Sequence, residues 1–395
     1  MNHLFQMKKS IFKLVLVLFG ITFLSCSSTK MAFDLKDIEK SRVLKNAELY
    51  LKEKPITLNN SFSKRSAGTI HDFYSEGDYW WPDSQNPNGP YIRKDGMTNP
   101  DNFNAHREAL IRFSQISGAL GSAYILTKDQ KYADALAFHL QAWFVHESTK
   151  MNPNLLYAQA IKGIATGRGI GIIDTIHLIE VAKAIQAIED STALSNADFT
   201  TIKLWFSNYL NWMTTHEYGI SERDNGNNHS VCWTMQVAAF ADLTEDKVTM
   251  DFCRNFYKNT LLPNQMAEDG SFPLELKRTK PYGYSLFNLD AMANICQILS
   301  TKEDNLFAFT TVDGRNLALG LQFMAPFIAN KSLWKYPKDV MYWDEWPVRQ
   351  SSLLFGGIAF KNKKYTDLWK SLNGDFTNPE VIRNMPVRYP LLWVH

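Results

Sequence analysis

The stretch LIRFSQISGALGSAY, residues 110–124, is the clearest indication of the fold. Its apolar and small side chains recur every three or four residues, at Leu110, Phe113, Ser117, Leu120 and Tyr124. That spacing gives an α-helix one continuous face to bury. The next segment repeats the period at Leu136, Leu140, Trp143 and Phe144. We therefore expect two neighbouring helices here.

The helical period continues along most of the remaining chain. Further helices are predicted at residues 170–188, 199–213, 230–240, 250–262, 284–299, 306–328, 352–360 and 364–372. Turn residues such as Asn152-Pro153-Asn154 and Asp224-Asn225-Gly226 separate them. No alternating run is long enough to require a sheet, so the protein is predicted to be all-α. Repeated helix pairs without a sequence repeat favour an α/α toroid, with an α-solenoid as the alternative.

The beginning of the chain is predicted to be a lipoprotein signal peptide, residues 1–25. Two lysines precede an apolar run over residues 11–23, which is too short and wrongly flanked for a membrane span. The run ends in Leu24-Ser25-Cys26, which resembles a bacterial lipobox, so acylation of Cys26 would anchor the protein to a membrane. A plain secretory signal is the alternative. Residues 26–40 are then a polar tether without an acidic cluster, and by resemblance to Bacteroidota lipoproteins this favours the periplasm over the cell surface.

Residues 41–395 are predicted to form a single domain, long enough for a substantial core. The formal charge of +2 indicates no nucleic-acid partner, and a polyanionic ligand would need cations gathered in one cleft. The remaining cysteines, Cys232, Cys253 and Cys296, are odd in number and lack metal-ligand spacing. Buried free thiols are expected, with neither a disulfide framework nor a zinc site. We expect a monomer.

Four side chains in the second half of the chain suggest a chemistry: Asn228, His229, Arg278 and Tyr284. They suit removal of the proton beside a sugar carboxylate, followed by expulsion of the 4-linked neighbour. Asn228 and Arg278 would hold the carboxylate and stabilise the enolate-like transition state. His229 or Tyr284 would take the proton, and Tyr284 would protonate the departing oxygen. The predicted helix starts at these residues would add free N–H groups that attract anions.

Several segments, in order along the chain, carry a family resemblance. They are Tyr79-Trp80-Trp81-Pro82-Asp83, Pro90-Tyr91-Ile92-Arg93, Asn152-Pro153-Asn154-Leu155, Tyr157-Ala158-Gln159-Ala160, Gly167-Arg168-Gly169-Ile170-Gly171, Asn227-Asn228-His229-Ser230, Glu275-Leu276-Lys277-Arg278-Thr279 and Tyr284-Ser285-Leu286. The chain resembles the alginate lyases of polysaccharide lyase families 5 and 38, which share an α/α toroid. The resemblance implies an active site at Asn228, His229, Arg278 and Tyr284. The spacing from Arg278 to Tyr284 is one residue shorter than in family 5, so family 38 is the closer relative and Tyr282 is a rival for the catalytic phenol.

Substrate-binding residues are predicted mainly around the long loop at residues 74–104, which is typical of a lid or binding rim. Aromatic faces stack on sugar rings, and arginine binds carboxylates in bidentate fashion. The candidates are Trp80, Trp81, Arg93, Lys94, Gln159 and Arg168. The alternatives are a buried core for the tryptophans and solvated surface for the cations. His106-Arg107 is expected to be a structural pair at a helix start.

Local alternatives also exist for the four catalytic candidates. The Asn-Asn-His stretch could be only a turn and helix cap, Arg278 a surface cation, and Tyr284 a core phenol. Their combination in family order favours the catalytic interpretation.

Two rival functions remain open from the sequence. A glycoside hydrolase would need an acid–base pair among solvated carboxylates, drawn from Glu217, Glu222, Asp224, Glu268, Asp269 and Glu275. A non-catalytic glycan-binding lipoprotein would use the aromatics alone. The lyase prediction implies an anionic polysaccharide partner, alginate or alternatively glucuronan. It also implies no metal or organic cofactor, because Asn228 and Arg278 could replace the calcium that other lyases use.

Overall fold

The stretch at residues 110–124 lies within helix α2 (Ala105–Thr127), and the predicted face is buried. In the computed structural model, which describes residues 33–394, the predicted apolar positions of this helix are at most 5% exposed. A Cβ added to Gly121 would lie only 3.2 Å from the Cα of Ala184 in helix α4 (Leu178–Ala187). The glycine therefore lets α2 and α4 pack at close range.

Helices dominate the part of the chain that the structure describes, as predicted. The others are α1 (Leu35–Tyr50), α3 (Gln130–Phe144), α5 (Asn196–Thr215), α6 (Glu217–Arg223), α7 (Asn228–Thr244), α8 (Lys247–Phe256), α9 (Leu262–Gln265), α10 (Pro273–Leu276), α11 (Pro281–Leu299), α12 (Leu317–Ala329), α13 (Ser351–Ala359), α14 (Lys363–Ser371) and α15 (Pro379–Arg383). Short 3₁₀ turns lie at Leu58–Asn60, Gly169–Thr175, Lys331–Leu333, Trp343–Glu345 and Pro390–Leu392, and a π turn at Tyr257–Leu261.

Two predicted helices are too long. The helix expected at residues 306–328 begins only at Leu317, because a turn around Gly314, with φ of +88°, precedes it. The side chain of Asn316 then caps the helix by accepting a hydrogen bond from the Leu319 amide at 3.0 Å. The helix expected from residue 170 begins instead with a 3₁₀ turn before α4.

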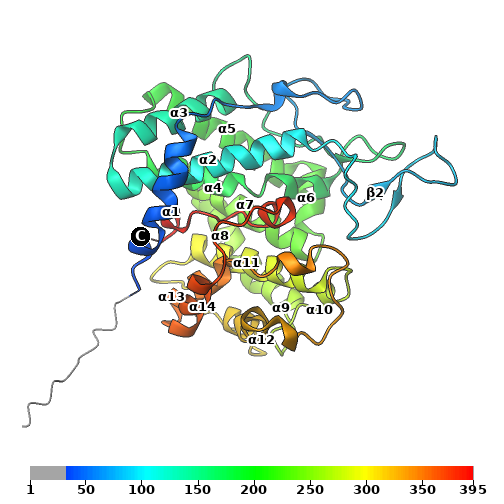
Figure 1. Cartoon of the computed structure of the whole chain (residues 1–395), viewed down its shortest axis with the longest axis vertical. Coiled ribbons are helices and arrows are strands. Elements are labelled where there is room, and N and C mark those ends of the chain that lie inside the picture. Colours follow the sequence, from blue (N-terminus) through cyan, green and yellow to red (C-terminus); the bar gives the residue numbers. More distant parts are fainter. Residues whose placement is uncertain (1–32, 395) are drawn as a thin grey trace, which may run out of the picture. The chain divides into compact units, whose positions relative to one another are not determined.

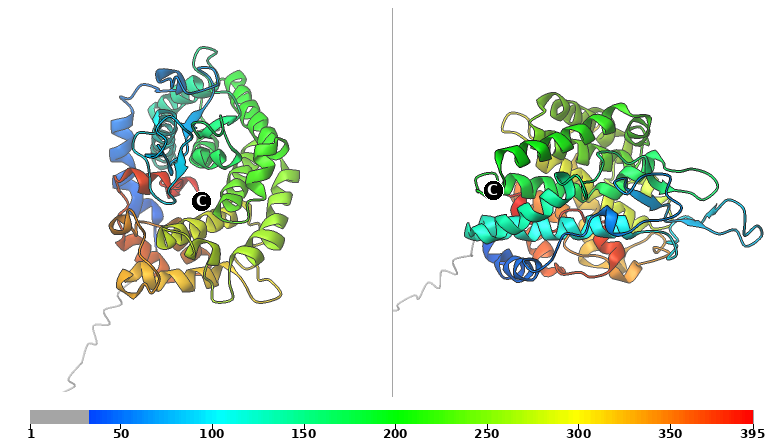
Figure 2. Two further views of the ribbon diagram at one scale, coloured as in Figure 1. Left: turned by 90° about the vertical axis from the view of Figure 1, so that its right-hand side faces the viewer. Right: turned by 90° about the horizontal axis from the view of Figure 1, so that it is seen from above.

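The helices form an inner and an outer layer (Figures 1 and 2). In the inner layer α2 packs on α4, α4 on α7, α7 on α11, and α11 on α13. In the outer layer α3 packs on α2, α5 and α8 on α7, α12 on α11, and α14 on α13. The turn at Pro390–Leu392, near the end of the chain, returns to pack on α1, α2 and α4. This arrangement of paired inner and outer helices confirms the predicted α/α toroid.

The domain begins earlier than predicted. Helix α1 starts at Leu35, inside the segment expected to be a tether, because Leu35, Val43 and Ala47 bury one face of it in the core. From Leu35 onward the chain forms one compact unit. The predicted signal peptide and the lipidation site at Cys26 lie outside the described residues and stay predictions. Within residues 33–394, no helix is both long and apolar enough to cross a membrane.

The cysteine prediction is confirmed within the described part of the chain. Cys232, Cys253 and Cys296 are all free and buried.

Two small strand pairs shape the loop at residues 74–104. Strand β1 (Tyr74–Glu76) pairs in parallel with β4 (Tyr157–Ala160), and β2 (Trp80–Trp81) pairs antiparallel with β3 (Ile92–Arg93). In the second pair Trp80 lies opposite Arg93, and Trp81 lies opposite Ile92. This register decides which side chains share a face of the hairpin.

A buried acid in α11 should make the stability of the fold depend on pH. Asp290 accepts hydrogen bonds from the amides of Ser351 and Ser352 and so caps α13, while burial raises its pKa to about 7. Because this pKa exceeds the usual value of 3.8, the stabilisation is fully present below about pH 3.8 and is lost as the pH rises through about 7.

Asp290→Asn keeps an acceptor oxygen and cannot ionise. Relative to the wild type, the variant should therefore gain roughly 1.4 kcal/mol for each pKa unit of the shift as the pH rises. Urea unfolding of both proteins at pH 4.5 and 7.5 measures this gain. An equal difference in unfolding free energy at the two pH values would contradict it.

Candidate active site

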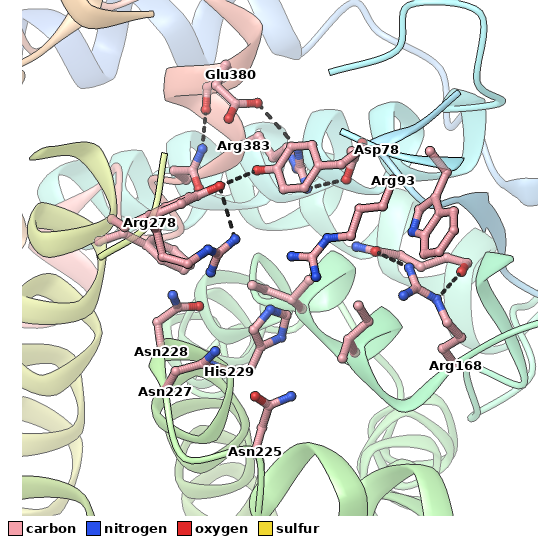
Figure 3. A pocket seen from close by; sticks show the side chains of 18 residues that line it. Asp78, Arg93, Arg168, Asn225, Asn227, Asn228, His229, Arg278, Glu380 and Arg383 are labelled. Atoms are coloured by element: carbon pink, nitrogen blue, oxygen red, sulfur yellow. Dashed lines mark hydrogen bonds and ion pairs between the residues drawn. The ribbon is translucent and has the colours of Figure 1, made fainter. Parts of the chain in front are cut away.

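One cavity of about 260 Å³ collects most of the predicted site residues (Figure 3). All four catalytic candidates line it, and so do four of the substrate-binding candidates: Asn228, His229, Arg278, Tyr284, Trp80, Arg93, Gln159 and Arg168. The lining residues come from the β2–β3 hairpin, β4, the Gly169–Thr175 turn, α7 and the segment before it, α11 and the segment before it, and α15. Segments far apart in the sequence therefore build one polar pocket.

Asn227 places the first two candidates. Its side chain accepts a hydrogen bond from the His229 amide at 3.0 Å, which makes Asn227 the N-cap of α7. The expected cap is thus present, and it sets Asn228 and His229 in the first helical turn, facing the pocket. The cap and the catalytic interpretation are compatible.

Asn228 is held by a buried carboxylate. Its backbone N–H donates to Glu275 Oε1 at 2.9 Å, and its side-chain Nδ2 donates to Glu275 Oε2 at 2.7 Å. Burial raises the pKa of Glu275, and the hydrogen bonds from Asn228 oppose that shift. The side-chain amide is therefore fixed, with its second N–H available to an anion.

His229 is also held by a carboxylate. Its Nδ1 lies 2.6 Å from Glu222 Oε1, and Glu222 is fully buried near the end of α6. The prediction that Glu222 and Glu275 are solvated loop residues is wrong, because each is buried against a pocket residue. The sequence could not reveal these partners.

Arg278 forms a bidentate pair with Asp95, which follows strand β3. Its Nε and Nη2 lie 3.1 and 3.0 Å from the two carboxylate oxygens, and Arg93 reaches the same carboxylate at 2.6 Å. Burial opposes the charge of Asp95, but the hydrogen bond from Arg278 and its charge outweigh this and lower the pKa of Asp95 to about 2. Asp95 stays ionised and ties the hairpin loop to the site. Sequence reasoning missed it, although it stands two residues after Arg93.

Tyr284 lies between a second phenol and Arg278. Its hydroxyl is 2.7 Å from the hydroxyl of Tyr79, and Arg278 Nη2 donates to it at 3.5 Å. Burial raises the pKa of Tyr284, the neighbouring Tyr79 adds to that rise, and the opposing effect of Arg278 is smaller. The resting side chain is therefore a protonated phenol, suited to donate a proton. The charge of Arg278 favours the phenolate of Tyr284, but burial outweighs this effect.

Tyr282, the rival phenol, does not reach the pocket. It is fully buried, and its hydroxyl donates to the Phe327 carbonyl at 3.2 Å. Residues two apart on a helix point in nearly opposite directions, so Tyr282 and Tyr284 cannot share a face of α11. The structure favours Tyr284 as the catalytic candidate.

Gln159 and Arg168 form another side of the pocket. Gln159 has a left-handed backbone with φ of +50°, a strained conformation that often marks a functional site. Its carbonyl accepts from Arg168 Nε at 2.8 Å, and its Oε1 accepts from Arg168 Nη2 at 3.2 Å. Burial lowers the pKa of Arg168 to about 10. Among the described residues, no carboxylate lies within ion-pair distance of Arg168, which leaves its charge available to an anionic ligand.

Trp81 and Lys94 were also predicted to bind substrate, but the structure places both of them outside this pocket. Successive strand residues point to opposite faces, so the register that turns Trp80 and Arg93 inward turns Trp81 away. Trp81 Nε1 donates to the Met97 carbonyl at 2.9 Å, and Lys94 Nζ lies 5.0 Å from the centre of the Trp81 ring. These two side chains interact with each other on the far side of the hairpin.

The pocket offers no free carboxylate pair. The six acids considered for a hydrolase do not line it. The acids that do, Asp78 and Glu380, are held in ion pairs with Arg383 and Lys280 at 2.5 and 2.6 Å. Across residues 33–394, no group of three or more His, Cys, Asp or Glu side chains is placed to hold a metal ion. This geometry disfavours the two-carboxylate chemistry of a hydrolase.

The predicted structural pair at the start of α2 is also as expected. His106 Nδ1 accepts from the Tyr74 amide at 3.0 Å, and Arg107 pairs with Asp78 at 2.7 Å. Both side chains hold the loop that supports the pocket.

Known proteins match both the sequence and the fold. A family model described as alginate lyase matches residues 59–334. The chain belongs to the alginate lyase family. A crystal structure of an alginate lyase from Bacteroides ovatus is 30% identical, with a TM-score of 0.77 over 91% of this chain and 93% of that one. Two variants of alginate lyase A1-III complexed with tetrasaccharide, His-to-Ala and Tyr-to-Phe, share the fold at 15% identity and a TM-score of 0.57 over 91% and 94% of the two chains. No curated protein matches the sequence.

The family assignment makes this alginate lyase family member a polysaccharide lyase and confirms the predicted resemblance. Whether family 5 or family 38 is closer stays a prediction. The residues that sequence reasoning missed are Tyr79, Asp95, Glu222 and Glu275 as partners of the catalytic candidates. Tyr79 and Glu275 carried a signal, because each belongs to a segment that supports the resemblance.

The geometry of α11 predicts that Tyr284, and not Tyr282, carries activity. Tyr284→Phe should lower the turnover number by on the order of a hundredfold or more, because it removes the proton donor. Tyr282→Phe is the matched control, since it loses only a buried hydrogen bond and should keep near-normal turnover. Initial rates of product formation by both variants measure the difference. Near-normal turnover in Tyr284→Phe with loss in Tyr282→Phe would reverse the assignment.

Proposed function

We propose that this enzyme cleaves alginate, a 4-linked polyuronate, by β-elimination. The observation that carries the proposal is the meeting of Asn228, His229, Arg278 and Tyr284 at one pocket that has no free carboxylate pair. The relatives named above, described as alginate lyases, support alginate as the substrate. Their bound tetrasaccharide supports an oligosaccharide-sized site.

The proposed reaction begins with neutralisation of the uronate carboxylate. The free N–H of Asn228 and the guanidinium of Arg278 bind it, and both stabilise the negative charge that develops when the C5 proton leaves. Arg278 must then share its charge between the substrate and Asp95, which it already binds. These contacts lower the barrier to forming a carbanion beside an existing carboxylate.

The C5–H and C4–O4 bonds then break, a C4–C5 double bond forms, and O4 takes a proton from Tyr284. When the C5 hydrogen lies on the face opposite the leaving oxygen, Nε2 of His229 is the base. When the two lie on the same face, Tyr284 acts as base and acid in turn, and it must first release its own proton to solvent, after which the Tyr79 hydroxyl, 2.7 Å away, can donate a hydrogen bond to the phenolate. The product carries an unsaturated uronate end.

The elimination predicts a specific optical signal. Incubation with alginate should produce ultraviolet absorbance from the conjugated double bond, and polyglucuronate tests glucuronan as the alternative substrate. A chelator should leave the rate unchanged, because Asn228 and Arg278 take the place of a metal ion. New reducing ends without absorbance would indicate a hydrolase, and no products at all would indicate a binding protein. Loss of activity on chelation that calcium restores would contradict the metal-free mechanism.

The charge of Arg168 predicts a role in binding a neighbouring uronate. Arg168→Gln should raise KM about tenfold or more, since charge-assisted hydrogen bonds to a carboxylate are lost, while kcat should change little. Arg278→Ala should lower both kcat and kcat/KM, because Arg278 contacts the reacting sugar. Lys94→Gln is the control, since Lys94 lies outside the pocket and should keep wild-type kinetics. An unchanged KM in Arg168→Gln would exclude a binding role for this side chain.

A further inference from the structure

The contact between His229 and Glu222 stands out from the other buried acids. The Glu222 side chain is fully buried, and its Oε1 lies 2.6 Å from Nδ1 of His229. Its Oε2 has no hydrogen-bond partner among the described residues. Within the same part of the chain, no lysine or arginine lies within ion-pair distance of it. Among the described residues, His229 is thus the only side chain that forms a hydrogen bond or ion pair with this carboxylate.

The backbone around Glu222 is tightly packed, which fixes the position of helix α6. Helix α6 packs on the Gly169–Thr175 turn, on α5 and on α7. A Cβ added to Gly219 would lie 1.9 Å from the Met213 carbonyl oxygen, and a Cβ added to Gly169 would lie 2.7 Å from the Tyr218 carbonyl oxygen. Only glycine permits these approaches, so α6 packs closely against α5 and against the Gly169–Thr175 turn.

A buried carboxylate with so few partners has a high desolvation cost, so a purely structural role is a poor explanation. Glu180 gives the comparison inside the same protein. It is equally buried, and it accepts hydrogen bonds from the amides of Arg388 and Tyr389 at 2.9 and 2.7 Å. Those contacts tie the C-terminal segment to α4 and explain Glu180 as structural. Glu222 makes no such backbone contact.

We propose that Glu222 is a positioning residue that fixes His229 with its proton on Nδ1 and so presents an unprotonated Nε2 to the pocket. The carboxylate accepts from Nδ1–H, and the other ring nitrogen is then the acceptor for the C5 proton. When that proton moves to Nε2, the ring becomes an imidazolium, and the adjacent carboxylate stabilises its positive charge. The electrons of the C5–H bond form the double bond, and the leaving oxygen takes its proton from Tyr284.

This inference rests on the proposed elimination, and it makes Glu222 matter only where His229 is the base. A substrate whose cleavage survives His229→Gln should therefore survive Glu222→Gln. The two alginate epimers, mannuronate and guluronate, differ at C5 and present the C5 hydrogen on opposite faces. They are the substrates on which the two bases can be separated.

The kinetic test compares Glu222→Gln, His229→Gln and the double variant on mannuronate-rich and guluronate-rich blocks. Wherever His229→Gln loses activity, Glu222→Gln should lose on the order of tenfold to a hundredfold in kcat. The double variant should be no worse than His229→Gln alone, because both changes disable one unit. Glu180→Gln is the matched control and should keep wild-type kcat on both blocks. Thermal unfolding of each variant shows whether it is folded.

A spectroscopic test is independent of activity. In ¹⁵N-histidine-labelled protein, the His229 signals, identified by their loss in His229→Gln, should show a protonated Nδ1 with a strongly downfield proton and an unprotonated Nε2 at neutral pH. The downfield proton should disappear in Glu222→Gln and persist in Glu180→Gln.

Several results would overturn the proposal. Two are kinetic results for Glu222→Gln: full activity on a His229-dependent substrate, or an equal loss of kcat on a substrate that tolerates His229→Gln. The third is that His229→Gln is active on both blocks. The fourth is a proton found on Nε2 of His229 in the wild type. If the wild type formed no unsaturated product from either block, the proposed function would fail, and the spectra would still decide how His229 is held.

Discussion

The pocket depends on the buried carboxylate of Asp78. It pairs with Arg107 of α2 at 2.7 Å and with Arg383 of α15 at 2.5 Å, and so joins segments 305 residues apart. Burial opposes its charge, but the two arginines outweigh burial and hold the pKa of Asp78 below its usual range. Because Tyr79 follows Asp78 directly, this ion-pair network also fixes the hydroxyl that touches Tyr284. These ion pairs therefore fix, through Tyr79, the position of the Tyr284 hydroxyl, which is the candidate proton donor.

Lys280 extends the same network beneath the two phenols. It pairs with Glu380 at 2.6 Å, and its Nζ lies 5.3 Å from the ring centres of both Tyr79 and Tyr284. Burial opposes the charge of Lys280, and Glu380 outweighs burial, so its pKa is raised and the ammonium stays charged. A permanent cation at this place favours the ionised form of a phenol. Lys280 therefore offsets part of the desolvation penalty for ionising Tyr284.

The sequence predicted well what depends on local spacing. The apolar period gave the helices, and the joint presence of Asn228, His229, Arg278 and Tyr284 gave the centre of the pocket. The sequence did not predict contacts between side chains that lie far apart along the chain. Glu275 contacts Asn228 across 47 residues, and Asp95 contacts Arg278 across 183, and no periodicity encodes such pairs. The placement of Trp81 and Lys94 outside the pocket could not be predicted for a different reason, because the register of a two-residue strand cannot be read from its sequence.

The same partners indicate which elimination the resting site is prepared for. Tyr284 is held as a phenol by burial and by Tyr79, so the proton donor is already in place. A bound uronate would add negative charge nearby and oppose ionisation of Tyr284 further, unless Arg278 and Asn228 neutralise it. His229, in contrast, has its Nδ1 in contact with Glu222, and in the proposed tautomer its Nε2 is free to accept a proton. For the proposed β-elimination, this arrangement suits a base and an acid that are different side chains, on opposite faces of the sugar. In the proposed elimination on one face, Tyr284 would also have to release its proton to solvent before it could act as the base.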